Sequence, residues 1–400
     1  MYKSISGSPA FSRIYPNLIA FFRHPAALAV GLTFTADSLM FGTWVTQIPF
    51  IKTRLGLDDG ELGLALFGMP LGLLVMNPVS PWLMQKFGLV RITVWSTIFM
   101  AFTFVLPMWM MTRWSLFGVL FLIGSAVALM NVGMNTCATN IEEAEGRKIM
   151  STCHGMWSLG GMVGSGFSAL MIRWGVFPPY HLTIQAIILA VVTLLFLRPA
   201  LSRVPVVEHH NAEHSNFAFP KGDLLLMILI GTSTSMCEGV AFDWSAVYLR
   251  DSLGAVEQVA ALGFMFFSLS MMAMRFIGDV LIPSFGERRL LYFTVFASVI
   301  ALVMVIASTS PMSGLFGFFL LGMGVALAAP ILFNACARVP GFAPGAGLAS
   351  YATFSFIGFL MGPPVIGLIG REFGLDKGFM MVAVCTACTI LAVRKVGYLR

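Results

Sequence analysis

The chain has 400 residues, of which 58% are hydrophobic and only 10% are charged, and it contains 36 phenylalanines and 27 methionines. A soluble core does not need that much apolar material, so the composition excludes an ordinary soluble domain and indicates a membrane protein. The formal net charge of +6 comes from basic residues scattered over short loops. This pattern argues against a nucleic-acid partner and suits a surface of anionic lipid.

Apolar stretches of about 20 residues recur along the chain, and each is long enough to cross a hydrocarbon layer roughly 30 Å thick as a helix. We therefore predict an all-α, multi-pass membrane protein with twelve spans. They cover residues 26–50, 62–83, 92–112, 115–140, 152–172, 178–197, 224–248, 259–282, 290–309, 314–337, 346–370 and 379–395.

Residues 1–25 precede the first span and carry Lys3, Arg13 and Arg23 without a separate short apolar core. This composition favours an uncleaved tail over a signal peptide. Most lysines and arginines fall on one side of the predicted spans, and such residues prefer cytoplasmic loops. We therefore expect both termini, including a short tail at 397–400, in the cytoplasm, with the protein in a bacterial inner membrane.

The longest polar interruption, residues 199–223, divides the chain into two predicted six-helix bundles at 26–198 and 224–396. Several matches between the halves share one offset of 198 residues: Leu55-Gly56 with Leu253-Gly254, Phe87-Gly88 with Phe285-Gly286, and Arg91 with Arg289. Because six spans separate the copies, the halves share one topology and are related by a pseudo-twofold axis along the membrane normal. Such bundles enclose a cleft that opens alternately to either side.

The loop WLMQKFGLVR at 82–91 resembles a signature of the major facilitator superfamily, G-x-x-x-D-R/K-x-G-R-R/K, with Gln85 in place of the acid. A second copy lies at 275–289. The segments CHGMWSLGG at 153–161 and EGVAFDWSAVYL at 238–249 are similar to the YbjJ-like and rhizopine-transporter-like (MosC-like) branch, distantly related to sugar permeases. The resemblance implies the major facilitator fold, and an inter-helix cytoplasmic motif made of Lys86, Gly88, Arg91, Arg275, Asp279 and Gly286.

Two acids lie near the middle of predicted spans, Asp37 in the first and Glu238 in the seventh. A charge at the bilayer centre costs on the order of 2.5 to 3.5 kcal/mol, so each acid suggests a functional cavity. The resemblance implies that spans one, four, seven and ten line the central cleft. Spans four and ten add amides to that cleft, at Asn131, Asn135 and Asn334.

These five side chains are candidate substrate or proton-coupling residues. Carboxylates and amides can satisfy a polyhydroxyl or amino-polyol ligand with several hydrogen bonds. A carboxylate in such a cavity can also bind and release a proton during a cycle. The alternative is an acid that is neutral or paired and only fixes helix packing.

Further candidates flank the two acids. Asp243 is about 7 to 8 Å from the outer end of its helix, within reach of Arg250, Lys52 or Arg54, which predicts a gate or a packing role. Two further side chains, Trp44 and Trp244, occupy corresponding parts of spans one and seven, as interfacial anchors or as stacking surfaces for a ring.

His154 begins span five and is followed by Trp157. A histidine there can titrate near physiological pH and sense the inside state. A buried histidine bonded to a neighbouring helix is an equal alternative. We include both residues among the possible gate or stacking groups.

Other functional classes lack their motifs. The chain has no P-loop and no G-x-S-x-G elbow, and the histidines of EHHNAEH at 208–214 lie in the polar linker. We expect no enzyme activity, no cofactor and no metal site.

The leading hypothesis is a secondary transporter that works as a monomer and takes up a sugar-, polyol- or amino-polyol-like solute together with protons. A proton-driven exporter of an amphipathic compound is the first alternative, because the many Phe and Met residues can line an adaptable pocket. A non-transporting receptor or a membrane-embedded enzyme is the second.

Overall fold

The structure is a computed structural model that describes residues 18–207, 219–336, 338–339, 346–397 and 399, apart from the side chains of Asp279 and Ala349. Most of the predicted N-terminal tail and the whole EHHNAEH tract lie outside the described residues, as do two positions of the predicted C-terminal tail. The regular structure in the described ranges is helical.

From residue 25 onward, the described part of the first half has ten α-helices, joined by a 3-10 turn, η2, and a π-helical segment, η3. They are α2 (Pro25–Val45), α3 (Ile48–Leu55), α4 (Asp59–Leu66), α5 (Gly68–Met76), α6 (Ser80–Phe87), α7 (Leu89–Thr103), η2 (Leu106–Trp109), α8 (Arg113–Glu145), α9 (Met150–Arg173), α10 (Pro178–Val192), η3 (Thr193–Leu197) and α11 (Arg198–Leu201).

The second half follows the same plan, with a π-helical segment, η4, inside its first long helix. Its elements are α12 (Asp223–Gly239), η4 (Val240–Trp244), α13 (Ser245–Asp251), α14 (Glu257–Ala260), α15 (Leu262–Phe285), α16 (Glu287–Ile306), α17 (Pro311–Val325), α18 (Ala328–Cys336), α19 (Ala346–Phe373) and α20 (Leu375–Lys395).

The number of apolar spans differs from the predicted twelve. Eleven helical segments in the described residues are long and apolar enough to cross a membrane, which supports a multi-pass membrane protein. The predicted span at 152–172 corresponds to α9, which has 24 residues but is not among the eleven. Its sequence is rich in glycine and serine and includes a histidine, and these residues lower its hydropathy.

The offset of 198 residues is visible in the backbone. Four helix pairs begin 198 residues apart: α2 and α12, α4 and α14, α7 and α16, and α8 and α17. Gly56 and Gly254, which follow α3 and α13, both have positive φ, +63° and +67°. Gly88 and Gly286, which precede α7 and α16, also match, at +93° and +82°. Glycine tolerates this conformation and side-chain-bearing residues avoid it, so the same turns recur in both halves.

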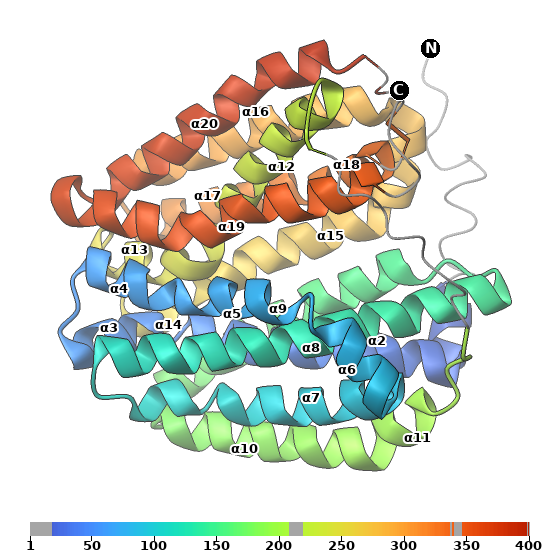
Figure 1. The fold of residues 1–400 in the computed structure, drawn as a ribbon. Helices are drawn as coiled ribbons and strands as arrows, with labels where there is room; N and C mark the ends of the chain where they lie inside the picture. The colour runs from blue at the N-terminus through green and yellow to red at the C-terminus, as the bar shows by residue number, and fades with distance from the viewer. Residues whose placement is uncertain (1–17, 208–218, 337, 340–345, 398, 400) are drawn as a thin grey trace.

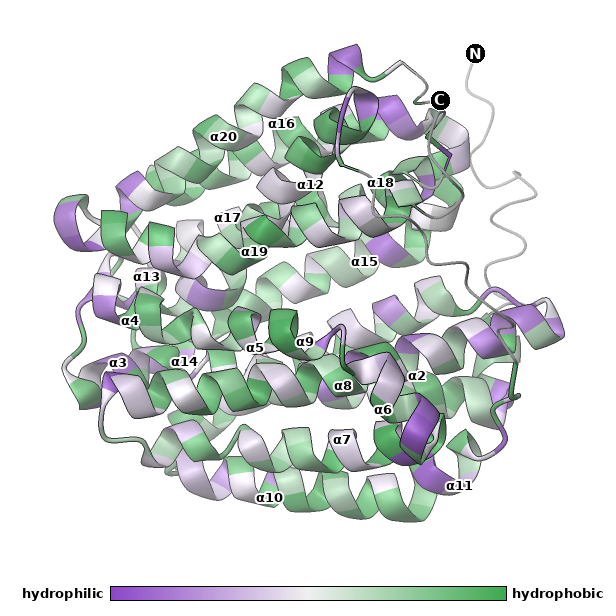
Figure 2. Ribbon diagram, in the orientation of Figure 1, coloured by the Kyte–Doolittle hydropathy of each residue, from purple (hydrophilic) through white to green (hydrophobic). Residues whose placement is uncertain are grey.

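Figure 1 shows the halves lying side by side, with the helices of each running in roughly the same direction. We call the end at which α2 begins and α20 ends the terminus end, and the end that carries α3, α4 and α13 the opposite end. Hydrophilic residues gather mostly at these two ends, and hydrophobic residues cover the helices between them (Figure 2). This distribution is the one expected of a body embedded in a bilayer.

The halves make their most extensive contacts along two seams. Helix α9 packs against α15, and α4 packs against α19 near the opposite end. At the second seam the helices approach so closely that a side chain at Gly63 would collide with the carbonyl oxygen of Pro363 and approach the Cα of Gly367. The opposite end is therefore closed by direct backbone contact.

We expect Gly63→Ala to force α4 and α19 apart, because the added methyl group has no room. Overpacking of this kind costs about 1 to 3 kcal/mol, so the melting temperature of the purified protein should fall by several degrees. The matched control is Gly118→Ala in α8, where an added Cβ meets no atom within 4 Å. Equal melting temperatures for the two variants would contradict this packing.

Candidate functional site

The first intramembrane acid is held by a tryptophan of a neighbouring helix. Asp37 lies on α2 with 5% of its surface exposed. The Nε1 of Trp157 on α9 donates a hydrogen bond of 2.9 Å to its Oδ2. A buried carboxyl group is costly without hydrogen bonds, so this contact fixes the side chain between α2 and α9.

The second acid is paired with an arginine. Glu238 lies on α12, and its Oε1 is 4.0 Å from Nη2 of Arg275 on α15. The Nη1 of Arg275 donates a hydrogen bond of 3.0 Å to Oγ of Ser158 on α9. Arg275 therefore links the second acid to the first half of the chain.

Because Ser158 directly follows Trp157, the two acids are joined by one chain of contacts. It runs from Asp37 through Trp157 and Ser158 to Arg275 and Glu238. We call these five residues the polar chain. Every step except the peptide bond between Trp157 and Ser158 is a hydrogen bond or an ion pair, and the polar chain contains groups of both halves.

The ion pair in the polar chain is loose. A guanidinium group has five N–H donors, and Arg275 uses them for one hydrogen bond and one ion pair at 4.0 Å among the described residues. Its side chain is 15% exposed and that of Glu238 is 21% exposed. Both groups can therefore exchange partners without a large rearrangement.

A cluster of aromatic rings lies next to the polar chain. Phe41 and Phe242 follow Asp37 and Glu238 by four residues, about one helical turn toward the opposite end. Their ring centroids are 5.2 Å apart, and Phe264 lies 5.7 Å from Phe41 and 5.4 Å from Phe242. The aromatic cluster comprises Phe41, Trp157, Phe242, Phe264, Phe267 and Phe359.

Both halves contribute to the aromatic cluster, which lies between the two acids and the closed opposite end. Edge-to-face contacts of this kind pack apolar surface tightly. The acids are therefore separated from the opposite end by apolar rings.

The predicted amides are only partly integrated into the polar chain. The Nδ2 of Asn135 donates to the backbone oxygen and to Oδ1 of Asn131, at 2.8 and 3.0 Å. Asn131 and Asn334 are exposed, and Arg338 donates to the backbone oxygen of Asn334. Among the described residues, these side chains make no hydrogen bond to Asp37 or Glu238, so their assignment to the site stays a prediction.

The remaining aromatic candidates differ in environment. Trp44 and Trp244 are 1% and 0% exposed, so neither indole lies at the surface of the protein. His154 is exposed, and its ring meets Phe34 edge to face at 5.3 Å. Its backbone oxygen accepts a hydrogen bond of 3.4 Å from Oγ of Ser158. His154 thus lies beside the polar chain.

Asp243 does not form the ion pairs that its position suggested. Arg250 and Lys52 both bind Asp251, and Arg54 donates to backbone oxygens of residues 107, 108 and 110. In the part of the chain that the structure describes, we find no ion pair of Asp243. It lies in η4, and π-helical turns are frequent at functional sites.

The residues of the predicted cytoplasmic motif are dispersed. Lys86 and Arg91 are exposed, and the Nζ of Lys86 lies 5.0 Å from the ring of Trp82. Gly88 and Gly286 make the turns described above, whereas the side chain of Asp279 lies outside the described residues. Arg275 belongs to the polar chain inside the helix bundle, whereas the motif predicted it at the cytoplasmic end of the protein.

Sequence reasoning missed Arg275 and the aromatic cluster as parts of the site. Arg275 opens the second motif copy, which drew attention to the cytoplasmic end. It also lies within an apolar helix of 24 residues, and a cation inside such a helix is itself a signal of function. The cluster carried no comparable signal, because 36 phenylalanines are distributed along the chain.

Outside the polar chain we considered two further kinds of site, a metal site and a pocket. No group of three or more His, Cys, Asp or Glu side chains able to hold a metal occurs in the described residues. A pocket of about 210 Å³ lies at the opposite end, lined among others by Gln47, Phe50, Phe177 and Glu257. It contains none of the residues of the polar chain.

Comparisons with known proteins assign the fold and the family. A family model described as Major Facilitator Superfamily matches residues 27–363. The chain is 30% identical over 366 residues to an uncharacterized MFS-type transporter of Yersinia pestis, covering 91% of this chain and 94% of the relative. It is 28% identical over 374 residues to Membrane protein MosC of Rhizobium meliloti, covering 90% and 88%.

Solved structures with much lower sequence identity share the architecture. The nucleoside transporter NupG superposes with a TM-score of 0.71 at 12% identity, covering 93% of this chain and 99% of its own. A D-xylose-proton symporter superposes with a TM-score of 0.72 at 13% identity, covering 93% and 97%. At these identities the similarity concerns the fold.

The polar chain makes a prediction about stability. We expect Arg275→Met to lower the free energy of unfolding by about 1 to 3 kcal/mol, because Glu238 is left without its counter-charge. Adding Glu238→Gln to this variant should restore part of the loss, since replacing both members of an ion pair removes the unpaired charge. Thermal unfolding of the two single variants and the double variant measures the coupling, and strictly additive losses would contradict the pairing.

Proposed function

The chain belongs to the major facilitator superfamily, in its MosC-like branch, and we propose that it takes up a small polar solute together with protons by alternating access. In this proposal both termini face the cytoplasm, so the opposite end faces outward. The two bundles, residues 26–198 and 224–396, rock against each other in a bacterial inner membrane, and one chain is the functional unit.

The observation that carries the proposal is the polar chain between the two acids. Asp37 lies on the first long helix of the first half and Glu238 on the first long helix of the second. Intramembrane acids are expensive and mark ion and substrate pathways. Here they are linked across the halves, so protonation of either one changes the contacts that hold α2, α9, α12 and α15 together.

The step that couples protonation to movement of the halves follows from the loose ion pair between Glu238 and Arg275. When Glu238 binds a proton, it loses the charge that attracts Arg275, and the guanidinium is free to strengthen other contacts. One such contact is Ser158 on α9, 3.0 Å away. Because α9 belongs to the first half, a proton at Glu238 alters the seam between the halves, which is the event that alternating access requires.

The solute is small and bears hydroxyl groups. Its hydrogen bonds come from the carboxyl groups of Asp37 and Glu238 and from the exposed amides of Asn131 and Asn334. Two proteins with the same fold are named as a nucleoside transporter and a D-xylose-proton symporter, which supports both a polar solute and proton coupling. The aromatic cluster closes the path between the solute and the opposite end, which faces outward in this proposal.

The proposal predicts the behaviour of two conservative variants in proteoliposomes. Asp37→Asn and Glu238→Gln should each abolish proton-driven accumulation, and at least one of them should retain exchange of labelled for unlabelled solute. The solute is first identified by a thermal-shift screen against sugars, polyols, amino sugars and organic acids, because a ligand that binds only the folded protein raises its stability.

The matched control for these variants is Glu61→Gln, which removes an acid at the opposite end whose ion pair lies within the first half. This variant should accumulate solute like the parent. Full accumulation by both Asp37→Asn and Glu238→Gln would refute the coupling role, and a protein that exchanges no solute at all would refute transport.

A further inference from the structure

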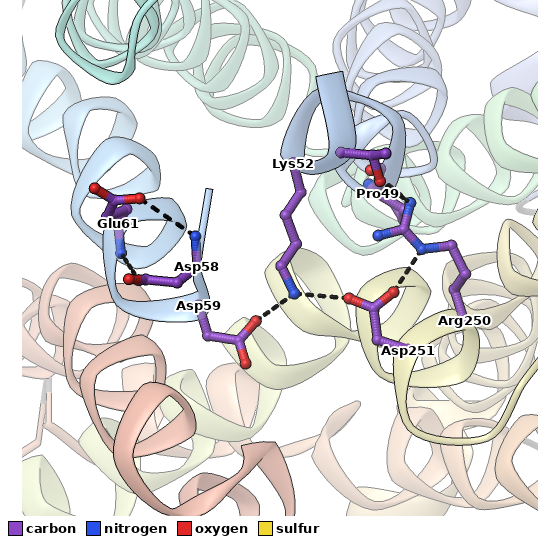
Figure 3. Close-up of polar contacts among 8 residues, drawn as sticks. Pro49, Lys52, Asp58, Asp59, Glu61, Arg250 and Asp251 are labelled. Carbon is purple, nitrogen blue, oxygen red and sulfur yellow. Dashed lines mark hydrogen bonds and ion pairs between the residues drawn. The ribbon is translucent and has the colours of Figure 1, made fainter. Parts of the chain in front are cut away.

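At the opposite end, one lysine bridges acids of both halves. The Nζ of Lys52 lies 2.6 Å from Oδ1 of Asp59, in its own half, and 2.7 Å from Oδ2 of Asp251, in the other half (Figure 3). The position of Asp59 follows from the local sequence. Asp58 and Glu61 form a capping box that begins α4, which places Asp59 in the first turn facing α3.

A second cation crosses in the reverse direction. The Nη1 of Arg250 donates to the backbone oxygen of Pro49 at 2.6 Å and to Oγ1 of Thr53 at 2.9 Å, both in the first half. Its Nε donates to Oδ1 of Asp251 at 2.6 Å. The carboxylate of Asp251 thus receives one cation from each half.

These contacts obey the internal repeat. Lys52 and Arg250 lie 198 residues apart, and so do Thr53 and Asp251. Lys52 binds residue 251 of the other half, and Arg250 binds residue 53, which is the equivalent position. A twofold relation between two surfaces requires such reciprocal contacts. The acceptor of Lys52 is a carboxylate, and the side-chain acceptor of Arg250 at position 53 is a hydroxyl group.

The two cations that cross between the halves are mostly buried, so their contacts are screened less by water than exposed ion pairs are. The side chains of Lys52 and Arg250 are 14% and 16% exposed. Burial alone would lower the pKa of Lys52, but hydrogen bonds to Asp251 and Asp59 and the charges of both acids raise it above its usual value. The lysine therefore stays charged at neutral pH. By contrast, the pair of Arg371 and Asp58 is 52% and 44% exposed at 3.7 Å and contributes little.

The terminus end is built differently. Among the described residues, the ion pairs at this end, such as Arg147 with Glu145 and Arg338 with Glu287, each join residues of one half. At the opposite end, the contacts of Lys52 with Asp251 and of Arg250 with Pro49 and Thr53 bridge the halves, in addition to the close packing of α4 on α19.

We propose that Lys52, Thr53, Arg250 and Asp251 form a reciprocal clasp that holds the outer ends of the two halves together and must open before the carrier faces outward. The inference rests on the proposed alternating access, and it adds the element that sets the resting state. The contact of Lys52 with Asp251 and the contact of Arg250 with Thr53 contribute separately, because each uses a different cation and a different acceptor. Moving the carboxylate from position 251 to position 53 therefore preserves the clasp.

The test measures the distance between two spin labels across the outer end by pulsed electron–electron double resonance. Spin labels replace Met111 and Met312, which are 78% and 71% exposed and belong to different halves, in full-length protein whose exposed Cys385 and Cys388 are alanine. Asp251→Asn should raise the ratio of long to short distances roughly fivefold or more, as expected when one to two kcal/mol of contact is lost.

The decisive variant combines Asp251→Asn with Thr53→Asp. It should return the distances to those of the parent, because Arg250 then has a carboxylate across the seam. Asp376→Asn is the control, since its ion pair with Lys377 stays within the second half, and it should leave the distances unchanged.

Two outcomes would overturn the clasp. One is an unchanged distance distribution in Asp251→Asn, with a melting temperature showing that the variant is folded. The other is a double variant that opens as far as Asp251→Asn alone. Neither readout uses solute or a proton gradient, so failure of the clasp is distinguishable from failure of proton-coupled uptake.

Discussion

The charge pair between Glu238 and Arg275 is the constraint on which the account depends. Neither charge is tolerated in lipid, and together they are tolerated only where the helices of both halves and water surround them. The bond from Arg275 to Ser158 extends the pair to α9, and the indole of Trp157 extends it to Asp37. Charge that must be balanced inside the membrane thus ties the two halves to one another.

The rest of the fold closes the opposite end of the molecule. On the side of the opposite end lie the aromatic cluster, the close contact of Gly63 with Pro363 and Gly367, and the contacts of Lys52 and Arg250. The three layers differ in chemistry: apolar rings, backbone packing, and ion pairs at the surface. They share one effect, which is that the seam between the halves is tight at this end.

Much of this arrangement is predictable from the sequence, and the remainder is not, for identifiable reasons. Length and hydropathy locate the helices, and the matched glycines at 56 and 254 reveal the repeat because the left-handed turn leaves little choice of residue. Asp37 and Glu238 are detectable because an acid is rare in an apolar run. Contacts between helices are different, since nothing in the sequence says that Arg275 turns toward Glu238 or that Asp251, in place of Asp243, receives Lys52. Helix α9, which the sequence did predict as a span, is less apolar than the other spans because it packs inside the molecule, where glycine and serine allow helices to approach closely.

The most direct measurement is the pH dependence of the distance between the halves at the terminus end, with spin labels at the exposed positions Lys148 and Lys395. The account predicts that acidification shifts the distance distribution of the parent more than that of the Glu238→Gln variant, in which Asp37 is the remaining acid of the polar chain. The acids of the opposite end are present in both proteins, so their titration does not distinguish them. An equal shift in both proteins would contradict the claim that Glu238 transmits protonation to the seam.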